Sequence, residues 1–371
     1  MMKGSYKTAG LLLVIVGIVI VIVIPQFTNR RNPEVINRGP GVTEVKQLSD
    51  YFAGLAGTAG NTEVYVLDSG KPGGTIMVLG GTHPNEPSGY LGAILMIENA
   101  KPTEGRMIVI PRANNSAFSH SDHMEGTPAY LQLQAKSGER TFRYGSRATN
   151  PIDQWPDPDI YVHAGPGQTL AGSDTRNLNR AYPGRPDGNL TEKVAYAITQ
   201  IIKQEHVNIA IDLHESSPEY PVINAMVAHE NAMGVVAEAA MNLQLDGVEM
   251  RIEPSPKNLH GLSHREWGDA TETLAVLMET ANPSQGRLRG EVSSDSIING
   301  KDALYVQAAK IGRLFVPFTA EGHPIEERVA RHLAGITEIV NVYNQKMPQH
   351  IQFTNLPTYQ ELLNKGIGFY L

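Results

Sequence analysis

The stretch 75–89, TIMVLGGTHPNEPSG, constrains the fold of this chain more than any other segment. Its first five residues form a short apolar and partly β-branched run, which predicts a buried strand. Gly80 and Gly81 end this strand and allow the backbone to turn sharply. The apolar run 90–97 that follows predicts a helix. The segment therefore has the strand–loop–helix order of an α/β protein.

His83 and Glu86 lie in this loop with the spacing His-x-x-Glu. A neutral imidazole and a carboxylate three residues apart can bind one Zn²⁺ ion, and open α/β sheets place their sites at the carboxyl ends of strands. The spacing alone is not specific, because the chain has 12 histidines and a second such pair, His323 and Glu326. The second pair precedes a charged amphipathic segment and has no strand before it. We interpret it as the start of a helix.

Strands and helices alternate along the rest of the chain. Further strands are predicted at 61–68, 104–110, 207–213 and 273–278. Further helices are predicted at 190–206, 230–243 and 325–343. This order predicts an α/β fold with a mixed, mostly parallel twisted sheet and helices on both faces. The segment 114–172 shows little periodicity, and a loop of that length inside a domain is usually functional.

The N-terminal run 9–24, AGLLLVIVGIVIVIVI, has no polar side chain and predicts a transmembrane anchor. A cleaved signal peptide is the alternative, but no small-x-small cleavage site follows the run. Basic residues flank the run on both sides, so their distribution hardly discriminates between the two orientations. We expect a single-pass membrane protein with its catalytic domain on the non-cytoplasmic side, as is usual for anchors with a short basic head.

We divide the chain into a short basic tail (1–8), the anchor (9–25), a linker (26–50) and one domain (51–371). The net charge of −7 and the lack of a basic cluster argue against nucleic acid as a partner. The chain has no cysteine, which excludes disulfides, thiolate zinc sites and cysteine nucleophiles. Any metal must therefore be held by histidine, aspartate or glutamate.

Three further fragments carry candidate functional residues. Asp212 and His214 follow a predicted buried strand, and His214 can complete a set of two histidines and one carboxylate. Asp212 is then suited to orient an imidazole. The segment 174–184, DTRNLNRAYPG, is rich in hydrogen-bond donors and can bind a carboxylate. Glu279 ends another predicted strand and could act as a general base near a metal.

Together these fragments resemble the M14-type zinc carboxypeptidases, and most closely their succinylglutamate desuccinylase/aspartoacylase branch. That branch has a motif similar to G-R-D-L-N-R-x-F-P-G, in which Asn177 here replaces the usual acid and Tyr182 the phenylalanine. The resemblance covers about 75–283. Its fragments occur in the order of that family: His83-x-x-Glu86, Arg176, Asn179-Arg180, Asp212-x-His214 and Glu279.

The resemblance implies a single zinc-carboxypeptidase-like domain that holds one zinc ion. It implies the following roles: His83, Glu86 and His214 bind the metal, Glu279 is the general base for a metal-activated water, Arg176 polarises the scissile carbonyl, and Asn179 and Arg180 bind the substrate carboxylate. The implied function is that of a zinc-dependent hydrolase of the carboxypeptidase or deacylase type. It cleaves an amide bond adjacent to a free carboxylate, in a peptide or an N-acyl amino acid.

Two other classes of function remain open from the sequence. The first is a non-catalytic, membrane-anchored binding protein that retains the fold and the metal. The second is a serine hydrolase, but the chain has no G-x-S-x-G motif. A P-loop is also absent, so nucleotide hydrolysis is not supported.

Overall fold

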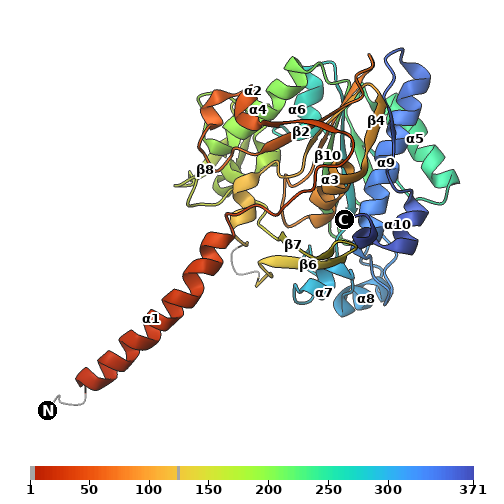
Figure 1. The fold of residues 1–371 in the computed structure, drawn as a ribbon. Coiled ribbons are helices and arrows are strands. Elements are labelled where there is room, and N and C mark those ends of the chain that lie inside the picture. Colours follow the sequence, from red (N-terminus) through yellow and green to blue (C-terminus); the bar gives the residue numbers. More distant parts are fainter. Residues whose placement is uncertain (1–4, 123–125) are drawn as a thin grey trace.

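The computed structural model describes residues 5–122 and 126–371, so part of the predicted basic tail 1–8 lies outside the described residues. An eight-stranded mixed sheet forms the centre of the domain (Figure 1). Its strands lie in the order β1 (Val42–Gln47), β2 (Glu63–Asp68), β5 (Arg106–Ile110), β3 (Thr75–Leu79), β10 (Ile209–Ser216), β13 (Leu274–Ala281), β11 (Ala225–Ala228) and β12 (Arg251–Pro254). The four central strands β5, β3, β10 and β13 are parallel. β1, β2 and β11 pair antiparallel with their inner neighbours, and β12 pairs parallel with β11.

Two hydrophobic cores, one on each face of the sheet, explain why the central strands are apolar without interruption. In β3, Ile76 and Val78 pack into one core, and Met77 and Leu79 into the other. Successive side chains of a strand point to opposite faces, so a strand covered on both sides needs apolar residues at every position. The predicted strand at Thr75–Leu79 and the predicted mixed sheet with helices on both faces are confirmed.

The first core lies under α3 (Pro87–Asn99), α5 (Met233–Leu245) and α9 (Ile325–Lys346), and the second under α2 (Leu48–Tyr51), α4 (Leu190–Gln204) and α6 (Ser263–Ala270). The other described helices of the domain are α7 (Ser294–Ile298), α8 (Ala303–Lys310) and α10 (Tyr359–Lys365). The α4 helix begins at a capping box. The Asn189 side chain accepts a hydrogen bond from the backbone N–H of Glu192, and the Glu192 carboxylate accepts one from the backbone N–H of Asn189. The long predicted helices at 190–206 and 325–343 therefore exist, with ends that differ by a few residues.

The segment 114–172 is more ordered than its sequence indicates. It contains two antiparallel hairpins, β6 (Tyr130–Ala135) with β7 (Gly138–Arg143), and β8 (Ile160–Val162) with β9 (Thr169–Ala171). A third two-stranded pair joins β4 (Lys101–Glu104) to β14 (Gln352–Thr354).

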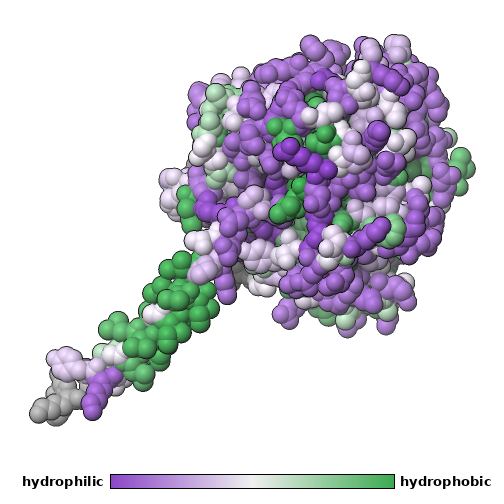
Figure 2. All heavy atoms as spheres, viewed as in Figure 1, coloured by the Kyte–Doolittle hydropathy of each residue, from purple (hydrophilic) through white to green (hydrophobic). Residues whose placement is uncertain are grey.

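The apolar run forms α1 (Ser5–Asn29), a single helix that projects away from the domain (Figure 1). Its residues Tyr6–Asn29 are long and apolar enough to cross a membrane, and the helix surface is green along most of its length in Figure 2. The helix extends beyond the predicted anchor 9–25 on both sides, because flanking polar residues continue its backbone hydrogen bonding.

The segment 26–50, which the sequence assigns to a linker, is bound to the domain. Val42–Gln47 forms the edge strand β1, and the Glu34 side chain is only 3% exposed. Its carboxylate accepts a hydrogen bond from Arg143 Nε at 2.8 Å and lies 3.4 Å from Arg112 Nη1. Burial alone would raise the pKa of Glu34, but Arg143 and Arg112 lower it below its ordinary value. The polar composition of this segment thus reflects buried ion pairs as well as exposure to solvent.

Candidate metal centre

The loop that follows β3 is shaped by its two glycines. A Cβ atom at Gly80 would lie 2.5 Å from the carbonyl oxygen of Gly89, so no larger residue fits where the loop passes the start of α3. Gly81 has a φ of +68°, a conformation that L-residues rarely adopt. The backbone therefore turns directly at the carboxyl end of the strand and brings His83 and Glu86 back over the sheet edge.

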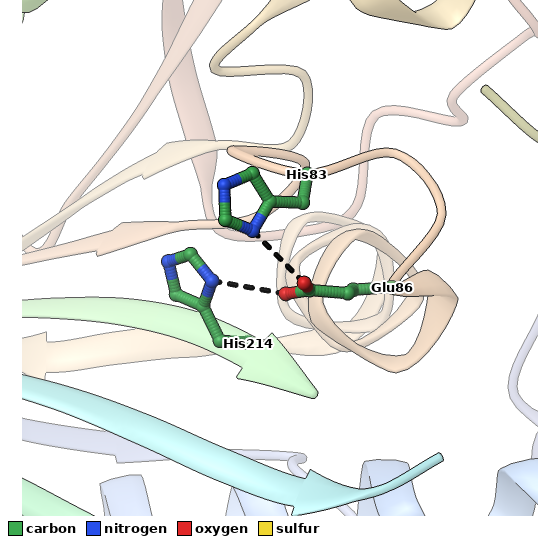
Figure 3. Close-up of side chains that lie close together, drawn as sticks. All are labelled: His83, Glu86 and His214. Atoms are coloured by element: carbon green, nitrogen blue, oxygen red, sulfur yellow. Dashed lines mark hydrogen bonds and ion pairs between the residues drawn. The ribbon is translucent and has the colours of Figure 1, made fainter. Parts of the chain in front are cut away.

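His83, Glu86 and His214 converge at this edge, as the sequence predicts (Figure 3). The Glu86 carboxylate lies between the two imidazoles, with Oε1 2.9 Å from His83 Nδ1 and Oε2 2.9 Å from His214 Nδ1. The potential ligand atoms of the three residues all lie within 4.8 Å of one another, and all three residues are buried. Two imidazole nitrogens and one carboxylate are a ligand set that catalytic zinc sites use, with a further position left open.

The outer nitrogen of His83 has a hydrogen-bond partner, and that of His214 lies against a carboxylate without forming a hydrogen bond to it. His83 Nε2 lies 2.9 Å from Asn177 Oδ1, and the same oxygen accepts a hydrogen bond from the backbone N–H of Asn179. Asn177 Oδ1 is therefore an acceptor, so His83 Nε2 carries the proton and its Nδ1 lone pair points toward Glu86. His214 Nε2 lies 2.9 Å from Asp212 Oδ2. Such outer partners orient metal-binding imidazoles, and Asp212 has the position that the sequence suggests for it.

The electrostatics of the group favour a cation. Burial lowers the pKa of His83 to about 4, so this imidazole is neutral at pH 7. Burial opposes the charged forms of His214 and Glu86 as well, but Asp212 and Glu86 raise the pKa of His214 well above its ordinary value. His83 and His214 in turn hold the pKa of Glu86 well below its own. The two buried carboxylates Glu86 and Asp212 therefore favour positive charge at His214, and a metal ion bound there would take the place of the proton on that imidazole.

Glu279 faces the same group from the neighbouring strand. It pairs in register with His214 across β10 and β13, and both residues line a cavity of about 430 Å³. Burial raises the pKa of Glu279 to about 8, and its Oε2 atom has no hydrogen-bond partner in the described part of the chain. A carboxyl group that is held in a cavity without a fixed partner can exchange a proton with a bound molecule.

Asn179 and Arg180 line the same cavity. Asn179 is held in place because its Oδ1 accepts a hydrogen bond from the backbone N–H of Ser263 at 2.9 Å. Burial and the nearby charge of Arg147 lower the pKa of Arg180. Two guanidinium groups that repel one another across a cavity favour an anion between them.

Arg176 does not reach this cavity, contrary to its predicted role at the scissile carbonyl. Its guanidinium donates two hydrogen bonds to Asp157, at 2.7 and 2.8 Å, and a third to the carbonyl oxygen of Thr149. Because every arm of its fork is directed at the protein, Arg176 stabilises the segment before β8.

A different arginine, Arg147, lies beside the metal candidates. Its Nη1 atom lies 3.4 Å from Glu86 Oε1, its side chain is 45% exposed, and it lines the cavity. The sequence contains no motif that singles out Arg147, since the residue lies inside the long segment 114–172. The only available signal was the length of that segment, which predicted a functional loop without naming a residue in it.

The chain is similar in sequence to a known deacetylase. The chain is 26% identical over 145 residues to an N-alpha-acetyl-L-2,4-diaminobutyric acid deacetylase of Halomonas elongata. The match covers 39% of this chain and 39% of the length of that deacetylase. No family model matches the chain.

Similar solved structures carry the same family descriptions. One is a metallo-carboxypeptidase from Burkholderia cenocepacia, with 11% identity, a TM-score of 0.48, and coverage of 84% of this chain and 67% of that one. Another is a succinylglutamate desuccinylase from a Silicibacter species, with 18% identity, a TM-score of 0.38, and coverage of 61% and 55%. The chain resembles the M14-type zinc carboxypeptidases and their desuccinylase/aspartoacylase branch. This confirms the resemblance that the sequence motifs indicate.

Proposed function

We propose that this chain is a zinc-dependent hydrolase that cleaves an amide bond adjacent to a free carboxylate. The observation that carries the proposal is the convergence of His83, Glu86 and His214 at the edge of a cavity that Glu86 and His214 line together with Glu279 and two arginines. Each of these groups has a use in amide hydrolysis.

The three convergent residues fit a zinc ion. Their Nδ1 and carboxylate atoms point toward one another, and the second imidazole nitrogens lie against Asn177 and Asp212. His83, Glu86 and His214 would hold the ion. When bound there, zinc supplies Lewis-acid catalysis, which polarises a carbonyl group and makes water more acidic.

The remaining residues supply the proton transfer and the binding of substrate. A bound cation would lower the raised pKa of Glu279 and ionise it. Glu279 then accepts a proton from the attacking water and delivers it to the leaving amine, which requires that its carboxyl group be free of other partners. Arg147 donates hydrogen bonds to the carbonyl oxygen as negative charge develops on it. Asn179 and Arg180 bind the free carboxylate next to the scissile bond.

The substrate class follows from this division of roles. A carboxylate at Arg180 and a scissile amide near Glu279 describe the last peptide bond of a peptide or an N-acyl amino acid. The similar deacetylase of Halomonas elongata is named for an N-acyl amino acid. The similar protein of Burkholderia cenocepacia is named as a carboxypeptidase. Both substrate types stay within the proposal.

We place the enzyme in a membrane through α1, as a single-pass protein whose domain lies on the non-cytoplasmic side. Support comes from the length and the apolar surface of Tyr6–Asn29. The predicted division into anchor (9–25), linker (26–50) and one domain (51–371) remains our proposal, with the qualification that much of the linker is bound to the domain.

The proposal is tested by Glu279→Gln in the full-length protein in detergent, assayed on peptides and N-acyl amino acids with and without zinc. We expect the variant to bind zinc with unchanged stoichiometry and to lose about 10²–10⁴-fold in kcat. Glu272→Gln is the matched control, because Glu272 lies just before the other end of β13 and lines a different cavity. Full turnover by Glu279→Gln would reject the assigned role.

The substrate panel also decides between catalysis and binding alone. Each substrate is paired with its carboxamide, which lacks the negative charge that Arg180 is proposed to bind. We expect zinc-dependent turnover of the acids and weak turnover of the amides. If the wild-type protein binds zinc and turns over no member of the panel, the chain is a metal-containing binding protein of the same fold.

A further inference from the structure

Two large apolar side chains stand out from the domain surface between α1 and β8. Ile152 is 82% exposed and Trp155 is 72% exposed. Single exposed apolar residues are normal on soluble proteins, but two of this size within four positions are an exception that points to a partner. We call Ile152 and Trp155 the apolar tip.

The apolar tip is tied to the end of the membrane-spanning candidate helix. Arg31, two residues after the last residue of α1, forms an ion pair of 3.1 Å with Asp153, which lies next to Ile152 in the chain. Asp153 is itself fixed by a 2.6 Å hydrogen bond from Ser116 Oγ. The tip therefore cannot move away from the helix end without breaking this ion pair.

A second contact holds the helix end to the same side of the domain. The guanidinium of Arg30 donates hydrogen bonds to Ser121 Oγ at 3.1 Å and to the carbonyl oxygen of Tyr144 at 3.2 Å. The buried Glu34 lies four residues further on and is bound by Arg143 and Arg112. The residues that follow α1 therefore contact the domain directly, and no flexible linker separates the helix from it. In Figure 1, α1 leaves the domain on the side that carries the β8 hairpin.

The length of α1 determines where the apolar tip would lie relative to the bilayer. Its 24 candidate membrane residues, Tyr6–Asn29, span about 36 Å as a helix, against a hydrocarbon core of about 30 Å. Asn29 and Arg31 would then lie in the headgroup layer. Since Asp153 binds Arg31, the neighbouring apolar tip would lie close to that same layer.

We propose that the apolar tip inserts into the headgroup layer of the bilayer that α1 spans, and so gives the domain a second point of membrane attachment. Tryptophan is enriched at this depth because its ring is apolar and its indole N–H is polar. The exposed Asp159 nearby limits the insertion to the interface. Two attachment points hold the domain in one orientation on the membrane. The inference depends on the membrane placement of α1 and not on the hydrolytic reaction.

The two tryptophans of the chain make a direct test possible, because Trp155 is exposed and Trp267 is fully buried. The full-length protein is reconstituted into phosphatidylcholine vesicles whose acyl chains carry bromine close to the headgroups. We expect the Trp155 emission to shift to shorter wavelength relative to water and to be quenched by the bromine. The Trp155→Phe variant retains only Trp267, and its unquenched emission gives the background and shows that the protein is folded.

A pair of matched variants tests whether the apolar surface causes the contact. Ile152→Asp places a charge in the tip, and we expect it to reduce the quenching of Trp155. Leu245→Asp is the control, because Leu245 is 85% exposed at the end of α5, away from α1. We expect the Trp155 emission of Leu245→Asp to be quenched by the bromine as strongly as that of the wild type.

The outcomes separate the possible failures. Flotation of the protein with the vesicles reports on α1, quenching reports on the tip, and turnover of a soluble substrate reports on the active site. Unquenched Trp155 in a protein that floats would overturn the proposal, as would failure of the full-length protein to float. Neither result would affect the proposed hydrolase activity.

Discussion

The chain contains the spacing His-x-x-Glu twice, and the two copies have unrelated surroundings. His83 and Glu86 are buried and contact each other, with Nδ1 2.9 Å from Oε1. His323 instead binds Glu327, four residues on, with Nδ1 3.0 Å from Oε2, and its Nε2 donates to the carbonyl oxygen of Pro317. The first copy belongs to a group of converging ligands, and the second stabilises the start of α9.

The difference comes from what precedes each pair. His83 follows a central strand and two glycines, at an edge of the sheet where β10 also ends and presents His214. His323 precedes α9, where Glu326 and Glu327 lie in the first turn and interact favourably with the helix dipole. A ligand spacing therefore becomes informative only when the fold supplies a third ligand from another strand.

The strongest test of this comparison removes one imidazole from each pair. We expect His83→Ala and His214→Ala to lose bound zinc and to reduce turnover to background, because two ligands no longer form a stable site. His323→Ala should retain one zinc per chain and full turnover. Metal analysis of the purified proteins measures this directly. Stoichiometric zinc in His214→Ala would show that His214 is not a ligand.

The next largest effect on turnover is expected from the arginine that polarises the scissile carbonyl, which is either Arg147 or Arg176. We expect Arg147→Ala to lower kcat by about 10²–10³-fold, since it removes a donor to the developing oxyanion. Arg176→Ala removes hydrogen bonds to Asp157 and should mainly lower thermal stability. The ratio of the two kcat values, measured at saturating substrate, decides between them. A larger loss of kcat in Arg176→Ala would restore the role that the sequence motif assigned to it.

A smaller effect is expected from the residue that orients His83. Asn177→Ala removes the acceptor for His83 Nε2–H, so the imidazole is free to rotate or change tautomer. We expect zinc affinity to fall by about 10–100-fold, as is usual when an outer partner of a ligand is lost. Competition with a chelator measures the change. Asn177→Asp keeps an acceptor at this position and should retain tight binding, whereas equal weakening in both variants would assign Asn177 a purely structural part.

The central part of the fold follows from the sequence because its strands are apolar on both faces and its long helices are amphipathic. The strand at Thr75–Leu79 and the helix α9 are examples. The outer strands of the sheet were missed, β1 at one end and β11 with β12 at the other. β11, Ala225–Ala228, has four residues and no period that distinguishes it from a loop, and β1 lies in a polar stretch that pairs only because β2 offers an open edge.

The residues of the candidate site also differ in whether local sequence could predict them. The convergence of His83, Glu86, His214 and Glu279 could be predicted because each lies near the carboxyl end of a strand or in the loop after it, and parallel strands bring their carboxyl ends together. Arg147 could not be predicted, because it lies in a loop whose path depends on contacts with distant residues, such as the hydrogen bond from Ser146 to Asp122. Local pattern gives no information on such contacts.

The weakest effect on activity, and a distinct effect on stability, is expected at the second His-x-x-Glu copy. Glu327 accepts hydrogen bonds from His323 and from Arg331 Nη2, the latter at 2.7 Å. Burial alone would raise the pKa of Glu327, but these two partners lower it from 4.5 to about 2. The folded state therefore keeps the carboxylate ionised at a pH where the unfolded chain is protonated. The contribution of Glu327 to stability is present above its ordinary pKa and is lost as the pH falls toward 2.

We expect Glu327→Gln to lower the free energy of unfolding at neutral pH by on the order of 2 kcal/mol. We also expect the free energy of unfolding of this variant to fall less steeply in acid. Urea unfolding across the acid range measures both, with Glu326→Gln as the control that keeps the wild-type profile. Loss of zinc in Glu327→Gln would mean that the two copies of the spacing are not independent.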